Sequence, residues 1–156
     1  MTPPGPDPAA VEAFWHEFCE ATGVTGRPVD VFCFGDSVAM ADELLALVLA
    51  GTKRATAGLL ADYDEEGFRP APGDHSVVHA GDGTPAAVIR TRAVHTGPLS
   101  SVDATFAWEE GEGDRTLDGW LEGHRAYVRR AFAAAGRPAD DDPQLLFERF
   151  DLVWPA

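Results

Sequence analysis

A lysine and a threonine three residues apart are the first candidates for chemistry in this chain. Lys53 and Thr56 lie in the segment GTKRAT at 51–56. A hydroxyl group becomes a useful nucleophile when a base lies beside it, and a lysine serves as that base when burial or a neighbouring cation lowers its pKa. Residues i and i+3 of a straight strand point to opposite faces, so joint action requires a bent or helical backbone here. The alternative is that GTK merely ends a helix, with Lys53 near the negative end of the helix dipole.

A dense acidic segment is the second candidate. It reads EEGEGDR at 109–115 and follows Trp108. Carboxylates this close together repel one another unless they are solvated, paired or bound to a cation. Because carboxylates suit Mg²⁺ or Ca²⁺, Glu112 and Asp114 are candidate ligands for a divalent metal ion, although their spacing matches no EF-hand loop. The alternative is a solvated acidic loop.

The charge of the chain restricts its partners. The 156 residues include 12 basic and 26 acidic side chains, which give a formal charge of −14, and Lys53 is the single lysine beside eleven arginines. Non-specific binding of duplex nucleic acid depends on a basic surface that neutralises phosphates. The sequence therefore argues against a long duplex partner, whereas a small ligand or a short single strand is compatible with it.

Length and composition restrict the class of protein further. The length fits one domain, and a hydrophobic content of 45% is enough for an ordinary core. No apolar run approaches the roughly 20 residues of a membrane span, and the first residues lack the basic and apolar regions of a secretory signal. Two cysteines make neither a disulfide framework nor a metal motif. We therefore expect a cytoplasmic protein without a membrane partner.

The elements that must position these residues follow from hydrophobic periodicity and from turn and capping residues. In chain order, the expected segments are a helix at 8–22, a strand at 29–34, a helix at 38–50, a loop at 62–73, a hairpin of strands at 76–78 and 86–94, a helix at 116–135 and a strand at 145–154. Because the strands are mostly neighbours through hairpins, this order predicts an α+β fold with a small, largely antiparallel sheet or barrel and helices packed outside.

Several of these segments, taken together, resemble the ASCH domain. They read FGDS at 34–37, ADELLALVLAGTKRAT at 41–56, GD at 73–74 and FAWEEGEGDRTLDGW at 106–120. The resemblance covers residues 30 to 154 and is closest to the longer bacterial type, which carries an extra N-terminal helix. It implies a PUA-like fold, which is a small, mostly antiparallel β-barrel with flanking helices. The chain then divides into a disordered lead at 1–7, an N-terminal helix and linker at 8–28 and an ASCH domain at 29–156.

The resemblance also implies a function related to RNA or nucleotides. The family is similar to PUA modules, which bind RNA. Short members act as amidohydrolases on N4-acylated cytidine through a Lys, Thr and Glu set, and a longer member is described as a metal-dependent ribonuclease that acts on single-stranded RNA. Matched onto this chain, the lysine and threonine are Lys53 and Thr56. The family glutamate falls on Glu110, with Glu109 and Glu112 as neighbouring alternatives.

These residues suggest a hydrolase in which Lys53, Thr56 and Glu110 form the floor of a cleft. Lys53 would take a proton from Thr56 or from a water, and Glu110 would hold Lys53 or relay a proton. The guanidinium groups of arginines and one aromatic ring would contact the ligand. The candidate ligand-binding residues are Arg54, Arg90, Arg92, Trp108 and Arg115. The expected ligand is single-stranded RNA, a nucleotide or a modified nucleoside, and a divalent metal ion is the one cofactor considered. The alternative is a non-catalytic RNA- or nucleotide-binding module.

Overall fold

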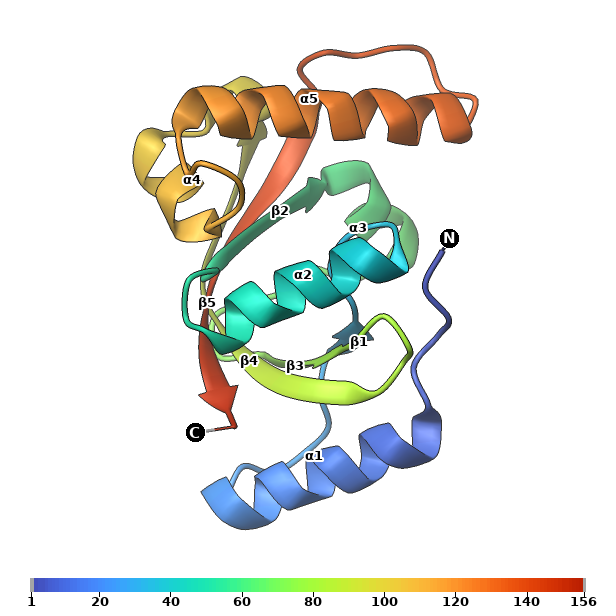
Figure 1. Cartoon of the computed structure of the whole chain (residues 1–156), viewed down its shortest axis with the longest axis vertical. Helices are drawn as coiled ribbons and strands as arrows, with labels where there is room; N and C mark the ends of the chain where they lie inside the picture. The colour runs from blue at the N-terminus through green and yellow to red at the C-terminus, as the bar shows by residue number, and fades with distance from the viewer. Residues whose placement is uncertain (1, 156) are drawn as a thin grey trace.

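An α+β fold built on one five-stranded sheet is seen in the computed structural model, which describes residues 2–155 (Figure 1). The strands are β1 (Asp30–Phe32), β2 (Ala55–Leu59), β3 (His75–His79), β4 (Pro85–Pro98) and β5 (Gln144–Trp154). The helices are α1 (Pro8–Thr22), α2 (Val38–Leu49), α3 (Leu60–Glu66), α4 (Ala104–Glu110) and α5 (Leu117–Ala134), with a short 3-10 helix at Leu99–Ser101.

The sheet is a curled half-barrel with the strand order β1-β3-β4-β5-β2. Strand β1 pairs with β3 in parallel, and the other three pairings are antiparallel. The register shifts twice along the β4–β5 pair, between Val88 and Ile89 and between Thr91 and Ala93, and such irregularities bend a strand. The predicted α+β class with a mostly antiparallel, barrel-like sheet is therefore confirmed, and β1 and β2 are its two edges.

Helices cover the sheet on different sides (Figure 1). Helix α1 packs Trp15 and Phe18 against β3 and β4. Helix α2 packs Leu44 and Val48 into a cluster with Phe150 of β5. Helices α4 and α5 form the largest cluster with β2 and β5; its buried aromatic members are Phe106, Trp120, Phe132 and Phe147. Burial of these apolar side chains stabilises the fold and fixes α2, α4 and α5 relative to the sheet.

Capping residues place the helices where the sequence predicted them. The Asp7 carboxylate accepts the Ala9 and Ala10 amides at the start of α1, and Gly23 ends that helix with φ +78°. Ser37 accepts the Met40 amide at the start of α2. Side-chain caps satisfy amides that have no partner inside the helix, so these local signals were enough to predict both helix starts.

Three segments differ from the prediction. Helix α3 occupies the first part of the expected 62–73 loop, α4 occupies part of the acidic region, and β2 was not predicted. The two helices have only seven residues each, which is too short for a clear apolar stripe. Strand β2 reads ATAGL, a sequence with weak strand propensity, and its pairing with β5 determines its structure.

The ends of the chain complete the fold. The Asp7 amide donates to the Gly83 carbonyl at 3.2 Å, which holds the start of α1 against the β3–β4 hairpin. Met1, the first residue of the predicted lead, and Ala156 lie outside the described residues. No helix within 2–155 is long and apolar enough to cross a membrane. The division into lead, N-terminal helix and ASCH domain stays a prediction.

Candidate functional site

A cavity of about 390 Å³ is lined by both edges of the half-barrel. Strands β1 and β2 each contribute residues, and so do β3, β5, all the helices from α2 to α5 and several of the loops between these elements. Its charged or titratable side chains are Asp30, Cys33, Lys53, Tyr63, Glu110, Glu112, His124, Tyr127, Arg130 and Glu148. A cavity of this size with convergent polar groups is the natural candidate for a ligand site.

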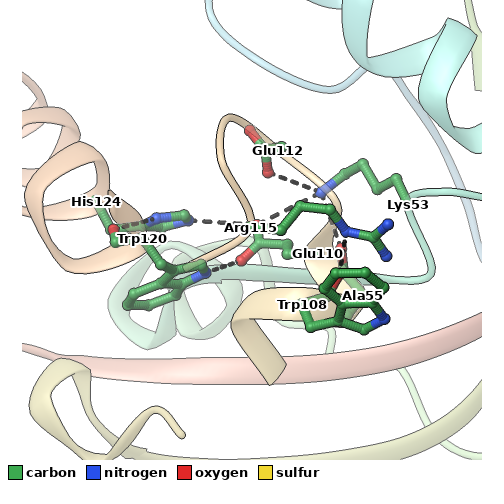
Figure 2. Close-up of polar contacts among 8 residues, drawn as sticks. All are labelled: Lys53, Ala55, Trp108, Glu110, Glu112, Arg115, Trp120 and His124. Carbon is green, nitrogen blue, oxygen red and sulfur yellow. Dashed lines mark hydrogen bonds and ion pairs between the residues drawn. The ribbon is translucent and has the colours of Figure 1, made fainter. Parts of the chain in front are cut away.

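Lys53 lies at the centre of one polar group in this cavity, with a side chain only 1% exposed. The amides of Thr52 and Lys53 both donate to the Leu47 carbonyl, so the chain turns sharply after α2 and directs Lys53 inward. Its Nζ donates to the Ala55 carbonyl at 2.8 Å, and to Glu112 at 2.9 Å and Glu110 at 3.4 Å (Figure 2). Three acceptors match the three N–H bonds of an ammonium group.

Glu110, the last residue of α4, is the buried anion of this group and is 2% exposed. It accepts a hydrogen bond from the Trp120 indole and lies 3.3 Å from His124 Nε2. Burial by itself would raise the pKa of Glu110, but the Lys53 charge and the contacts with His124 outweigh it and lower the pKa from 4.5 to about 2. Glu110 is therefore an ionised anchor that holds Lys53 in place.

The pKa of Glu112 changes in the opposite direction to that of Glu110, although Glu112 also accepts a hydrogen bond from Lys53. Its side chain is 32% exposed. Burial is the largest cause and raises the pKa of Glu112; the Lys53 charge opposes it, and the Glu110 charge adds to the increase, so that the pKa stays raised. Two carboxylates whose environments push their pKa values apart are the usual arrangement of an acid/base pair, so Glu112 is the carboxyl of this group best suited to exchange a proton.

His124 is a site residue that the sequence analysis did not select. Its ring stacks on Trp120 at 3.7 Å between centroids, and its Nδ1 lies 3.0 Å from the Trp120 carbonyl. Burial lowers the pKa of His124, but the hydrogen bond and charge of Glu110 reverse this effect and leave the pKa raised above 6.5. The available signal was its spacing, because His124 follows Trp120 by one helical turn and shares its face of α5.

The His124–Glu110 contact predicts a pH dependence of stability. A histidine whose pKa is higher in the folded state stabilises the fold fully below its unfolded pKa near 6.5, and this contribution disappears as the pH rises through the folded pKa. We expect the free energy of unfolding of the wild type to fall more than that of His124→Gln between about pH 6 and pH 9. Urea unfolding at several pH values measures this difference, and equal slopes for the two proteins would contradict it.

Thr56 reaches the same cavity from β2. It is paired with Glu148 in the β2–β5 register and lines the cavity wall. Lys53 bonds to the Ala55 carbonyl, and no hydrogen bond joins Thr56 to Lys53 among the described residues. The structure therefore brings Lys53 and Glu110 into contact and places Thr56 near them as part of the wall.

Trp108 and Arg115 lie together outside the cavity. The Arg115 guanidinium stacks 3.5 Å from the centre of the Trp108 ring, and its Nε donates to the Trp108 carbonyl (Figure 2). The ring remains 54% exposed. Neither side chain belongs to the cavity lining. The pair instead joins the two ends of the acidic segment 108–115, outside the cavity.

The other predicted arginines also lie away from the cavity lining. Arg54 and Arg90 are exposed, and the Arg54 backbone amide donates to the Glu109 carbonyl at 2.7 Å. Arg92 lies 3.8 Å from the Glu109 carboxylate. The arginine that lines the cavity is Arg130 of α5, so the predicted cluster of arginines around the ligand is not assembled there.

The same residues include three potential metal ligands. Ligand atoms of Glu110, Glu112 and His124 lie within 4.8 Å of one another. Lys53 Nζ already lies 2.9 and 3.4 Å from the two carboxylates and supplies the positive charge between them. The predicted ligand Asp114 instead accepts the Thr116 amide and hydroxyl at the start of α5. This donor set does not fit a divalent ion while Lys53 is charged.

A second polar group in the cavity was also missed by the sequence analysis. Glu148 of β5 is 5% exposed and accepts the Thr91 hydroxyl at 2.7 Å. Burial raises the pKa of Glu148, and the charges of Asp30 and Asp74 raise it further. It was missed because the charged residues of this Phe- and Leu-rich strand carry no motif, and pairing between strands far apart in sequence brings Thr91 to Glu148.

Comparison with known proteins gives consistent results. The family model of the ASCH domain matches residues 30–154. The crystal structure of a protein from Enterococcus faecalis, described under the family DUF984, is 32% identical, with a TM-score of 0.86 over 94% of this chain and 90% of that chain. The ASCH domain from Lactobacillus crispatus is 27% identical, with a TM-score of 0.81 over 96% of each chain. No match was found among curated proteins.

The matched range decides the family. It begins at the first residue of β1 and ends at the last residue of β5, and it contains every residue that lines the cavity. The resemblance of the GTKRAT and EGEGDR segments is thereby confirmed over most of the chain: this chain belongs to the ASCH domain family.

Proposed function

We propose that this protein is a hydrolase that removes an acyl group from the base of a small nucleoside. The observation that carries the proposal is the buried Lys53 between two glutamates whose pKa values differ in direction, Glu110 lowered and Glu112 raised. The pair lies in a cavity of about 390 Å³. Members of the family that the sequence resembles act on N4-acylated cytidine, which supplies the substrate class.

The cavity lining supports a neutral nucleoside over an RNA backbone. Four carboxylates line it, Asp30, Glu110, Glu112 and Glu148, against the fixed positive charges of Lys53 and Arg130. Phosphates need a locally positive surface, and the other arginines expected to provide it lie elsewhere. Aromatic side chains in the wall offer faces on which a base stacks; they are Phe32, Phe34, Tyr63, Phe68 and Tyr127.

The proposed reaction is hydrolysis of the amide bond by a water molecule. Glu112 takes a proton from the water as its oxygen attacks the acyl carbon, and Thr56 orients that water. Once Glu112 has taken the proton and lost its negative charge, the Lys53 N–H that it accepted turns to the substrate and stabilises the negative charge that develops on the carbonyl oxygen. When the C–N bond breaks, Glu112 returns the proton to the departing nitrogen, which leaves a carboxylic acid and the free amine of the base. Glu110 acts on Lys53 as a positioning residue.

Turnover of N4-acetylcytidine tests the proposal. We expect the wild type to release acetate in the presence of EDTA, and Glu112→Gln to lower kcat by about 10²–10⁴-fold at an unchanged unfolding midpoint. Glu122→Gln is the matched control, because Glu122 is exposed on α5 and does not line the cavity. Cleavage of a short RNA in place of acetate release would overturn the substrate class. Binding of the nucleoside without any turnover would favour the non-catalytic module.

A further inference from the structure

The second polar group of the cavity contains a buried carboxylate with one free oxygen. Glu148 Oε2 accepts the Thr91 hydroxyl, whereas no described residue donates to Oε1. Within residues 2–155, every fully buried side-chain nitrogen or oxygen has a hydrogen-bond partner. Glu148 Oε1 must therefore be open to the cavity that this residue lines. A carboxylate that is 5% exposed and faces a cavity with one oxygen unpaired requires a donor from a ligand or from water.

Asp30 of β1 offers a second free oxygen to the same cavity. Its Oδ1 accepts the Val31 amide at 2.9 Å, and no other described donor contacts the carboxylate. Burial raises the pKa of Asp30, and its charge acts on Glu148. No described lysine, arginine or histidine forms an ion pair with either residue. Strands β1 and β5 thus present two acceptors to one cavity, and no described cation is ion-paired with either of them.

Two hydroxyl groups on adjacent carbons are the donors that fit this pair. A single carboxylate commonly recognises the sugar of a nucleotide through its 2′-hydroxyl. No hydrogen bond joins Asp30 or Glu148 to Lys53, Glu110 or Glu112, so the two polar groups are separate hydrogen-bond networks in the wall of one cavity, with Thr56 paired opposite Glu148. If the acyl group of a nucleoside lies at Lys53 and the base lies against the aromatic wall, the sugar lies at the second group.

We propose that Glu148 and Asp30 form a ribose subsite, in which their free oxygens accept hydrogen bonds from the 2′- and 3′-hydroxyls of the ligand. This inference rests on the proposed function for the orientation of the nucleoside, and it adds that the protein selects ribonucleosides over deoxyribonucleosides and free bases. The 2′-hydroxyl is the group by which proteins distinguish the two sugars.

Binding measured by calorimetry tests the subsite separately from the chemistry. We expect cytidine to bind the wild type roughly 10- to 100-fold more tightly than 2′-deoxycytidine, the range for one hydrogen bond to a charged acceptor. Glu148→Gln should lose most of that preference while keeping the unfolding midpoint. Asp74→Asn is the matched control, since it removes another charge that acts on Glu148 from a residue that does not line the cavity, and it should keep the preference.

The outcomes separate this inference from the proposed function. A preference for cytidine that Glu148→Gln abolishes supports the subsite, even if N4-acetylcytidine is not hydrolysed. Hydrolysis of N4-acetylcytidine together with equal affinity for the two sugars would overturn the subsite and leave the proposed function intact. A ribose preference that survives in Glu148→Gln would also overturn it, and absence of binding by either nucleoside would overturn both.

Discussion

Replacing Lys53 with methionine is expected to lower the free energy of unfolding by about 3–5 kcal/mol, the usual effect of removing one partner from a buried ion pair. Methionine has a similar length and keeps the apolar contacts of the side chain, so the loss comes from the charge. Glu110, which is 2% exposed, would then be an anion with His124 and Trp120 as its remaining partners. Urea unfolding followed by tryptophan fluorescence measures the effect.

A second substitution separates this charge effect from a general loss of packing. In Lys53→Met/Glu110→Gln, the buried anion is also removed, and we expect most of the lost stability to return. Hydrolysis should remain absent in both proteins, because neither has the Lys53 N–H that stabilises the developing oxyanion. Equal stability of the single and double variants would show that the Lys53–Glu110 pair carries no significant coupling.

Gly111→Ala is the second substitution with a large expected effect. Gly111 ends α4 with φ +74°, and a Cβ atom there would lie 2.5 Å from the Thr52 carbonyl oxygen and 3.0 Å from the Lys53 amide. A contact of this kind with backbone cannot be relieved by rotating a side chain. The turn that carries Lys53 must move away from the end of α4, which carries Glu110. We therefore expect Gly111→Ala to lose both stability and hydrolytic activity.

Gly113→Ala provides the control in the same loop. Gly113 also has a positive φ, +58°, but a Cβ atom there would meet nothing within 4 Å. Both variants should lose about 1–2 kcal/mol from the left-handed conformation, and Gly111→Ala should lose more because of the clash. Urea unfolding and acetate release measured on the two variants test the difference. Similar free energies of unfolding and similar rates of acetate release for the two variants would mean that the loop shifts enough to relieve the clash with Thr52.

The sequence predicted the parts of the site that belong to continuous motifs. The Lys53 and Glu110 pair came from the family resemblance, and the structure brings these residues into contact. The bend that joint action of Lys53 and Thr56 would require is not seen between them, because the turn to the Leu47 carbonyl ends at Lys53 and Thr56 already lies in β2. Helix caps and apolar stripes were sufficient for α1, α2 and α5, since these signals depend on neighbouring residues alone.

The parts that could not be predicted depend on contacts between distant segments. Glu148 becomes a cavity residue because β5 pairs with both β4 and β2. The ligand contacts expected from Arg90 and Arg92 were inferred from the forked donors of arginine, and residue type does not specify what covers each face of a strand. Arg92 instead lies near Glu109 of α4. Alternation along a β-strand indicates on which face of the sheet a side chain lies. The helix that packs on that face determines which residue the side chain contacts.

The position of Lys53 and Glu110 along the chain has a consequence for folding. They are 57 residues apart, and Thr91 and Glu148 are separated by the same number. Closing loops of this length costs entropy before any contact compensates for it, and folds rich in such distant contacts form slowly. Neither polar group can assemble in a fragment that contains α2 and β2 alone. Because residues of β1, β2, β3 and β5 all line the cavity, its complete wall exists only when the whole sheet has formed.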